Sequence, residues 1–427
     1  MLNLRRQLKI VCVILVCCLC VACAADGLNL RQTNKLLLYC PEYLSDMIRT
    51  AISLFQEKFP NVEIENKLCS NDVAEYSQLL RTEVMAGKGP DLILFGDYEF
   101  QDTEKAMDAG IFYNIDSFLT SDDSFDISKY HPSIFNGGYY KNERLYIPLC
   151  YYAMDAVTTN ETRASFGVDL TEISSFEDWM HEFLEWQSKN TTDERVLTNC
   201  STETPYFYST YFGVRYINLE TGEILIDQNE FKLFMDFLKV KFPKLEYGFA
   251  DPRFSTNLKL VEAIRNDELL FHIYMMHQDW NLGIYQALSE NRTAQSLILP
   301  SMGSEQPLAT GRIMAAINNG GSNKFNAYEF LKILLSTEVQ SQPGYPVPVN
   351  NEALEYQLKL LTAQYGFADD EMDRMYADFQ SLGYIHPLSY TQYALFEDSM
   401  RPWFLDEKSY EDCLEDFRNR LEIFIDE

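Results

Sequence analysis

Apolar residues in the first third of the chain follow two alternating spacings. Short stretches typical of strands occur at 35–40, 62–68 and 92–95. Between the first two, apolar residues from Leu44 to Phe55 recur every three or four positions, on one face of a helix. A second helix is expected over 73–86, because Asp72 followed by Glu75 resembles a capping box. This alternation within about sixty residues predicts right-handed crossovers and a mostly parallel sheet.

The stretch 86–95, AGKGPDLILF, predicts a helix end, a turn and a buried strand in succession. Gly87 suits the left-handed position that closes a helix, and Gly89-Pro90 prevents the helix from continuing. The apolar run that follows is typical of a central parallel strand. Ligands bind at the C-terminal edge of such strands, so Asp97 and Tyr98 in the next loop are candidate ligand contacts.

The rest of the chain contains no internal repeat and no low-complexity linker. A middle region that mixes strands and helices is followed, from Asn326 onward, by a segment predicted to be almost entirely helical. A chain of 427 residues without a linker forms either one body or two lobes joined by several crossings. Pro148, which we expect to end a strand, and the segment 313–321 are the best candidates for those crossings.

The N-terminus has the pattern of an export signal. Basic residues precede the apolar run 10–22, which is too short to span a bilayer comfortably but suits a secretory signal. Cys23 follows this run in a context that resembles the lipobox of bacterial lipoproteins, with Cys20 in place of the usual leucine. We therefore expect a signal peptide over 1–22, a lipid on Cys23 and a tether over 23–34. The alternative is ordinary signal cleavage among chance cysteines.

The charge balance limits the classes of ligand. The chain has 35 basic and 64 acidic residues, and the signal contains three of the basic ones, so the mature net charge is −32. Such a field repels nucleic acid and gives no attraction to anionic lipid, and it favours a neutral ligand unless a basic pocket intervenes.

No metal or cofactor is expected. Five cysteines remain after the signal and the anchor, without metal-site spacing, and buried free thiols are preferred over a disulfide. His272 and His277 near Asp279 have a spacing that suits neither a strand nor a helix face, so no metal site is predicted there.

A set of motifs resembles the family 1 extracellular solute-binding proteins, the lipid-anchored or periplasmic receptors of ABC importers. The motifs occur in the order and spacing of that family: 55–64, 86–94, 109–112, 144–148, 326–336 and 346–351. Two segments depart from the family pattern, Thr158–Glu161 and the region 313–323, which has the common Ser-Lys-Asn motif only in the form Ser322-Asn323-Lys324, and they leave the exact hinge positions open.

The resemblance implies an α/β fold of the periplasmic-binding-protein type II. Two interwoven α/β lobes would close on a ligand by a hinge, with a largely helical C-terminal part. Lobe 1 would comprise 35–148 and about 301–345, and lobe 2 would comprise 149–300 and about 346–427. Such proteins are monomers on the outer face of the bacterial cytoplasmic membrane, and they deliver a sugar to membrane-embedded permease subunits without catalysis.

Aromatic and polar residues at the predicted loop ends are the candidate sugar contacts, since rings cover the C–H faces of a sugar and polar groups bind its hydroxyls. Besides Asp97 and Tyr98, they are Trp280, Trp403, Tyr151, Tyr152, Glu42, Tyr43 and Tyr345. For the tryptophans the alternative is core packing, for Tyr151 and Tyr152 packing under the hinge, and for Glu42 a favourable charge at a helix start. Trp179 and Trp186, seven residues apart on one helix, are expected in the core.

Three functions compete at this point. The first is a receptor that binds a neutral solute, a mono- or oligosaccharide, for an importer. The second is a surface sensing or adhesion lipoprotein that kept the fold. The third is a secreted glycoside hydrolase, which would need two carboxylates about a scissile bond; Asp97 and Asp279 could be imagined in those roles. No nucleophile elbow, zinc motif or phosphate loop is present in the sequence.

Overall fold

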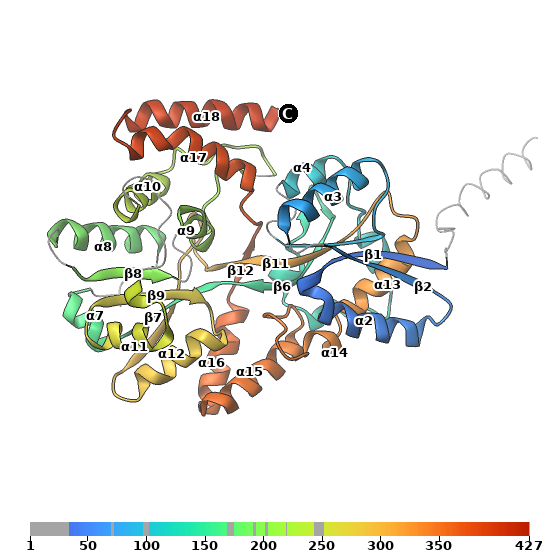
Figure 1. The fold of residues 1–427 in the computed structure, drawn as a ribbon, viewed down its shortest axis with the longest axis horizontal. Helices are drawn as coiled ribbons and strands as arrows, with labels where there is room; N and C mark the ends of the chain where they lie inside the picture. Colours follow the sequence, from blue (N-terminus) through green and yellow to red (C-terminus); the bar gives the residue numbers. More distant parts are fainter. Residues whose placement is uncertain are drawn as a thin grey trace, which may run out of the picture.

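Two β-sheets, each covered by helices, lie side by side and are joined by crossing strands (Figure 1). The computed structural model describes residues 34–69, 72–96, 102–168, 175–190, 194–200, 204–218, 220–242 and 252–426. The signal segment, Cys23, Asp97 and Tyr98 lie outside these residues. We use lobe 1 for the residues packed about the larger sheet and lobe 2 for those packed about the smaller one.

The sheet of lobe 1 confirms the predicted strand and helix alternation. It contains β1 (Lys35–Pro41), β2 (Glu63–Cys69), β3 (Leu92–Gly96), β6 (Ile147–Tyr152), β11 (Leu308–Ile317) and β12 (Gly383–Ile385). The strand order is β12-β11-β3-β1-β2, with β6 also paired to β11. β1 pairs with β2 and β3 in parallel, whereas β11 runs antiparallel to β3 and β6. The carboxyl ends of β1 and β3 therefore lie at the same edge.

Short elements and helices cover this sheet. They are η1 (Glu42–Leu44), α2 (Ser45–Lys58), α3 (Val73–Met85), α4 (Thr103–Asp108), α5 (Asp116–Leu119), η2 (Ile127–Lys129), α6 (Pro132–Phe135), β4 (Tyr139–Tyr140), β5 (Glu143–Arg144), α13 (Lys324–Leu334) and α14 (Thr337–Gln340). The predicted boundaries of α3 are confirmed: the Asp72 carboxylate accepts from the N–H groups of Ala74 and Glu75, and Gly87 follows the helix with φ of 67°.

Lobe 2 is built on a four-stranded sheet of order β10-β7-β9-β8. Its strands are β7 (Met154–Thr159), β8 (Val196–Cys200), β9 (Leu269–Met275) and β10 (Ala294–Ile298). Its helices are α7 (Asn160–Phe166), α8 (Phe176–Lys189), α9 (Pro205–Tyr211), α10 (Asn229–Lys241), η3 (Pro252–Phe254), α11 (Asn257–Arg265), α12 (Asp279–Ser289), α17 (Tyr390–Phe404) and α18 (Tyr410–Asp426). Its core is rich in aromatic rings, and Trp179 and Trp186 lie in it as expected.

Two helices lie beneath the junction of the lobes, α15 (Asn351–Tyr365) and α16 (Asp369–Gln380) (Figure 1). Their apolar faces, including Leu358 and Phe379, pack into the same core as the sheet of lobe 1, and α15 also contacts α12 of lobe 2. The assignment of 346–427 to lobe 2 stays a prediction. Within that range, the two helices α15 and α16 share the core of lobe 1.

Within the part of the chain that the structure describes, three segments cross between the lobes. The chain passes from β6 to β7 at Ala153, from β10 to β11 over 299–307, and from β12 to α17 over 386–389. The expectation that a strand ends at Pro148 is wrong, because β6 continues to Tyr152. Pro148 has no N–H to donate, and the pairing of β6 with β11 shifts register next to it.

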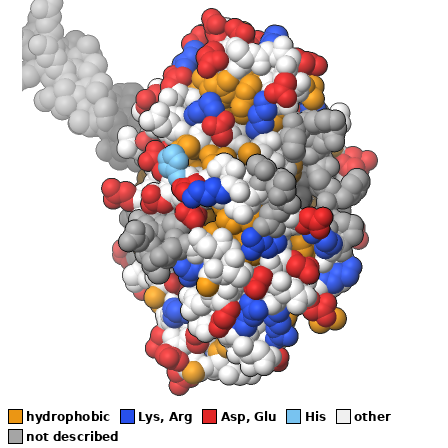
Figure 2. All heavy atoms as spheres, turned by 90° about the vertical axis from the view of Figure 1, so that its left-hand side faces the viewer, with side chains coloured by type: hydrophobic (Ala, Val, Ile, Leu, Met, Phe, Trp, Pro, Cys, Tyr) orange, Lys and Arg blue, Asp and Glu red, His pale blue; other side chains and the backbone are white. Residues whose placement is uncertain are grey.

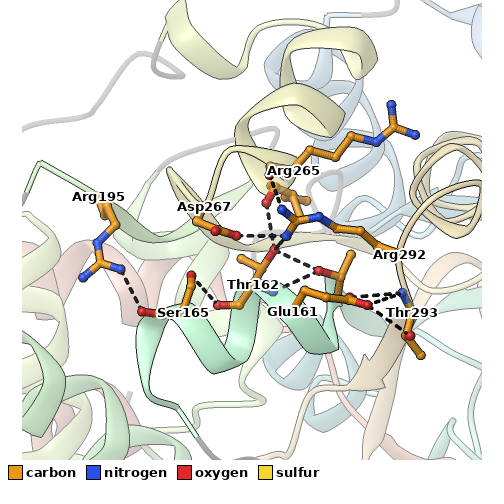
Figure 3. Close-up of polar contacts among 10 residues, drawn as sticks. Glu161, Thr162, Ser165, Arg195, Arg265, Asp267, Arg292 and Thr293 are labelled. Atoms are coloured by element: carbon orange, nitrogen blue, oxygen red, sulfur yellow. Dashed lines mark hydrogen bonds and ion pairs between the residues drawn. The ribbon is translucent and has the colours of Figure 1, made fainter.

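The start of α7 is tied to two other segments of lobe 2 by a polar cluster (Figure 3). The buried hydroxyl of Thr162 donates to the Ile264 carbonyl (2.7 Å) and accepts from Arg292 Nη1 (2.9 Å). Arg292 also binds Asp267 (2.9 Å), while the Glu161 carboxylate accepts from the backbone N–H of Thr293. Through these bonds α7 holds the starts of β9 and β10 together.

The outer side of lobe 2 carries acidic and basic side chains interspersed with small apolar patches (Figure 2). A groove of about 190 Å³ on this lobe is lined by residues of α8, β8 and α10. Among the described residues, no helix combines the length and apolar character that a membrane span requires.

Removing the Thr162 hydroxyl should destabilise lobe 2. The substitution Thr162→Val keeps the shape of the side chain but removes the hydroxyl that accepts from Arg292 and one of the hydrogen bonds to the Ile264 carbonyl, at a cost of about 1–3 kcal/mol. Urea unfolding of both proteins measures the difference. As a matched control, Thr82→Val removes an exposed hydroxyl that binds only its own helix and should change stability by less than about 0.5 kcal/mol. Equal stability of the two variants would contradict the role given to the cluster.

Candidate ligand-binding cleft

The carboxyl ends of β1 and β3 meet the crossing strand β11 at one edge of the sheet. β1 ends at Pro41, and Gly96 at the end of β3 pairs with Ile313 of β11. The neighbouring residue, Arg312, is exposed, although the rest of β11 is buried or half-buried. A charged side chain therefore emerges at the edge where α/β sheets bind ligands.

Two grooves meet at Arg312. One, of about 580 Å³, is lined by the start of α2, Tyr43 and Arg312. The other, of about 440 Å³, is lined by Gln278 and Asp279 of lobe 2 and by α15. The loop 342–346 and Arg312 line both, so the grooves adjoin and both lobes contribute to them.

The guanidinium of Arg312 is not neutralised by a carboxylate among the described residues. Its Nη1 lies 3.8 Å from the Met275 sulfur. The acidic residues that line the grooves have other partners: Asp46 pairs with Arg49 at 2.9 Å, and Asp279 accepts from Gln364 at 2.9 Å. Arg312 can thus donate several hydrogen bonds to oxygen atoms of a ligand.

Three of the predicted ligand contacts lie around this site. Tyr43, 51% exposed, and the more buried Tyr345 line the groove with Arg312. Trp280, 42% exposed, follows Asp279 at the start of α12, and its ring centroid lies 6.1 Å from that of Tyr274. Glu42 is exposed at the start of η1, beside Tyr43. Aromatic faces and polar donors are therefore available together.

Tyr151 and Tyr152 point to opposite sides of β6, because side chains alternate along a strand. Tyr152 pairs in register with Thr310, two residues before Arg312. Tyr151 is fully buried on the other side, with its ring 5.8 Å from His131 and 6.1 Å from Phe379. Tyr151 therefore packs under the hinge, which is the alternative to ligand contact given above for this residue.

Trp403 lies in the core of lobe 2 rather than at the grooves around Arg312. It is 9% exposed and packs against Phe404 and Tyr410. Lys239 covers the ring at 4.5 Å from its centroid and donates to the Trp403 carbonyl. Trp403 therefore has the position given above as the alternative to ligand contact, core packing, because its ring is enclosed by its own lobe.

The lobes also meet through polar groups next to α4. The Asp102 carboxylate accepts from the hydroxyls of Ser389 (2.7 Å) and Thr391 (2.9 Å). Tyr146 of lobe 1 forms a hydrogen bond of 2.7 Å with Nδ1 of His386. These bonds join lobe 1 to the segment that leads into α17.

Burial shifts the protonation of charged groups at this junction. Burial raises the pKa of Glu104 to about 7, with a further contribution from the charge of Asp102. Burial lowers the pKa of Arg215 to about 10, and burial together with the Arg215 charge lowers the pKa of His386 to about 4.

Sequence reasoning missed Arg312 and the polar residues of the junction. An arginine within the apolar run 308–317 was a visible signal, because a charge in a central strand needs a reason. Glu104 and Arg215 gave no such signal, since charged residues in amphipathic segments are ordinary. Among the described residues no group of three or more His, Cys, Asp or Glu side chains could hold a metal ion.

Solved structures with the same fold are ABC substrate-binding proteins, so the chain has the type II periplasmic-binding-protein fold that the motifs implied. The protein Lmo0181 from Listeria monocytogenes, solved in complex with cycloalternan, is 12% identical, with 92% of this chain and 98% of that chain covered and a TM-score of 0.57. Maltose-bound MalE3 of T. maritima is 15% identical, with coverage of 91% and 99% and a TM-score of 0.55.

UgpB from Mycobacterium tuberculosis, in complex with glycerophosphocholine, is 13% identical, with coverage of 92% and 99% and a TM-score of 0.56. No family model matches the sequence, and no curated protein sequence does either. The resemblance is therefore confirmed at the level of the fold.

The two candidate tryptophans should differ sharply in their contribution to stability. Trp403→Ala removes an enclosed ring and should lower the free energy of unfolding by about 3–5 kcal/mol, whereas Trp280→Ala should change it by less than about 1 kcal/mol, because much of that ring is exposed. Chemical unfolding without ligand provides the comparison. An unchanged stability of the Trp403 variant would disagree with its place in the core.

Glu104 should make stability depend on pH. Its pKa is raised in the folded protein, so the folded state binds more protons than the unfolded state between pH 4.5 and about 7, and stability falls as pH rises through this range. Glu104→Gln removes this loss: the variant should gain up to about 3 kcal/mol over the wild type at pH 8, and little of that gain should remain at pH 4. Urea unfolding of both proteins at pH 4 and pH 8 tests this prediction. A difference in stability between variant and wild type that is the same at both pH values would refute it.

Proposed function

We propose that this chain is the substrate-binding component of an ABC importer and that it binds a mono- or oligosaccharide between its lobes. The observation that carries the proposal is the adjoining pair of grooves around Arg312, to which both lobes contribute. Tyr43 offers a ring for the C–H face of a sugar, and Arg312 offers donors for its hydroxyl oxygens. The bound sugars of the structural relatives, cycloalternan and maltose, support this class of ligand.

The proposal includes how the protein is held and what it delivers to. The signal pattern of 1–22 and the lipobox-like Cys23 support an anchor on the outer face of the bacterial cytoplasmic membrane. The fold, which is that of ABC substrate-binding proteins, supports delivery to permease subunits by a monomer. No covalent step takes place at this protein: the solute is bound, enclosed and released.

Closure provides the affinity in this proposal. In the open form the groove residues are hydrated, and in the closed form the solute exchanges water for contacts with both lobes. The charge of the chain favours a neutral solute, because Arg312 is one cation in a strongly acidic protein.

A thermal-shift screen of the purified protein against sugars, polyols and oligosaccharides tests the proposal. Binding to the native state raises the melting temperature by mass action, so a true ligand should produce a shift that grows with its concentration. Arg312→Gln and Tyr43→Ala should each reduce the affinity for that ligand by about tenfold or more, equivalent to about 1.4 kcal/mol.

Tyr356→Ala is the matched control, because this tyrosine is exposed to a similar extent, 48%, on α15 and lines neither groove. Its affinity should equal that of the wild type. No shift with any solute would instead favour a sensing or adhesion protein, and cleavage of an oligosaccharide during incubation would favour a hydrolase.

A further inference from the structure

The short helix α4 of lobe 1 contacts lobe 2 at two points, beside α17 and beside the end of α18 (Figure 1). Just before the helix, the Asp102 carboxylate accepts hydrogen bonds from Ser389 (2.7 Å) and Thr391 (2.9 Å) at the start of α17. Three residues further on, the Lys105 ammonium lies 4.1 Å from the centroid of the Phe424 ring, in the last turn of α18. Positions three apart at a helix start lie on one side, so α4 presents both charged groups to lobe 2.

These two contacts join charged groups of lobe 1 to neutral groups of lobe 2. A buried ion pair between the lobes would leave a charge without its partner whenever the lobes part. In this contact the carboxylate and the ammonium both belong to α4, while lobe 2 provides two hydroxyls and an aromatic ring. When the lobes part, water can hydrate the charges and the hydroxyls alike, so the contact can be broken and made again.

The packing around this contact is incomplete. A cavity of about 360 Å³ lies beside it, lined by Glu104 and Lys105 from lobe 1 and by Gln392 and Phe424 from lobe 2. Among the described residues, the apolar clusters of the two lobes stay separate at this place: Phe424 belongs to the core of lobe 2, whereas Met107 of α4 belongs to a cluster of lobe 1. Separation at α4 therefore divides no shared apolar core.

We propose that α4 is a reversible latch: Asp102 and Lys105 hold the start of α17 and the end of α18 in the present arrangement and release them when the lobes turn. Because the two contacts stabilise this arrangement relative to others, they set its population in the protein without solute. A solute that prefers one arrangement then binds with the help of the latch or against it. Only this effect on binding rests on the proposed function.

Distances between two spin labels, measured by double electron–electron resonance on the protein without solute, test the latch. The labels are attached through Ala109→Cys, directly after α4, and Glu407→Cys, between α17 and α18, and both positions are exposed. Cys23 and Cys200 are replaced by serine. The remaining cysteines of the mature chain are buried and do not take up label: Cys40, Cys69, Cys150 and Cys413.

Lys105→Met keeps the stem of the side chain and removes its charge, and Asp102→Ala removes both hydrogen-bond acceptors. Each change should lower the ratio of molecules at the wild-type distance to molecules at longer distances by about threefold or more. Lys67→Met is the matched control, because its ammonium lies 4.5 Å from the centroid of the Tyr39 ring within lobe 1. Its distance distribution should equal that of the wild type. If Asp102→Ala fails to fold, Lys105→Met decides alone.

Two results would overturn the inference. The first is a wild-type distance distribution in the Lys105 and Asp102 variants, and the second is an equal change in the Lys67 control. Since these measurements contain no solute, they are independent of the proposed function. Unchanged distances together with a solute found by thermal shift would remove the latch and leave the proposed function, whereas longer distances in a protein that binds no solute would do the reverse.

Discussion

The pairing of β11 with three other strands is the constraint on which the rest of the structure depends. β11 is hydrogen-bonded to β3, β6 and β12, and it arrives directly from the sheet of lobe 2. This pairing fixes Gly96 opposite Ile313 and so sets the end of β3 beside Arg312. Gly311 is part of the same arrangement, because a Cβ there would lie 2.6 Å from the Met314 sulfur and 3.0 Å from the Tyr384 hydroxyl. A larger residue would therefore require the ends of the Met314 and Tyr384 side chains to move.

The lobes contact each other through polar groups next to α4, and around Arg312 they are separated by open grooves. Around Arg312 the side chains are exposed and can exchange water for a solute with little cost in burial. Next to α4 the groups are already enclosed, and their protonation is shifted by burial, as the raised pKa of Glu104 and the lowered pKa of His386 show. The region around Arg312 is suited to binding a solute. The contacts next to α4 set how strongly the two lobes hold together.

Local sequence patterns predicted the elements of lobe 1 well, because each signal lay within a few residues. Asp72 caps α3 and Gly87 adopts a left-handed conformation, as their residue types indicate. Local patterns failed to predict where a strand ends when that depends on a strand far away in the sequence. Pro148 lies within β6 because β11 pairs with it in a shifted register there. The fold of the whole chain could be anticipated only from the order of many weak motifs.

The candidate site was predicted in part. Tyr43, Tyr345 and Trp280 lie near the grooves because they follow the ends of β1 and β9 or precede the turn at Pro346, positions that the sequence reveals. Trp403 could not be placed, since its enclosure depends on Lys239 and Tyr410 from separate helices. Glu104 and Gln392 line one cavity from positions 288 residues apart, and no spacing rule relates them.

Three crossings between the lobes also restrict the motion that the fold permits. A single covalent link would allow one lobe to swing, twist and slide. With Ala153, 299–307 and 386–389 crossing together, sliding would stretch or compress all three connections at once, whereas turning about a line through the three segments alters only a few backbone torsions. The molecule therefore retains essentially one rotational degree of freedom, and the end of α18, which reaches across to the neighbouring lobe, travels along an arc rather than a straight path.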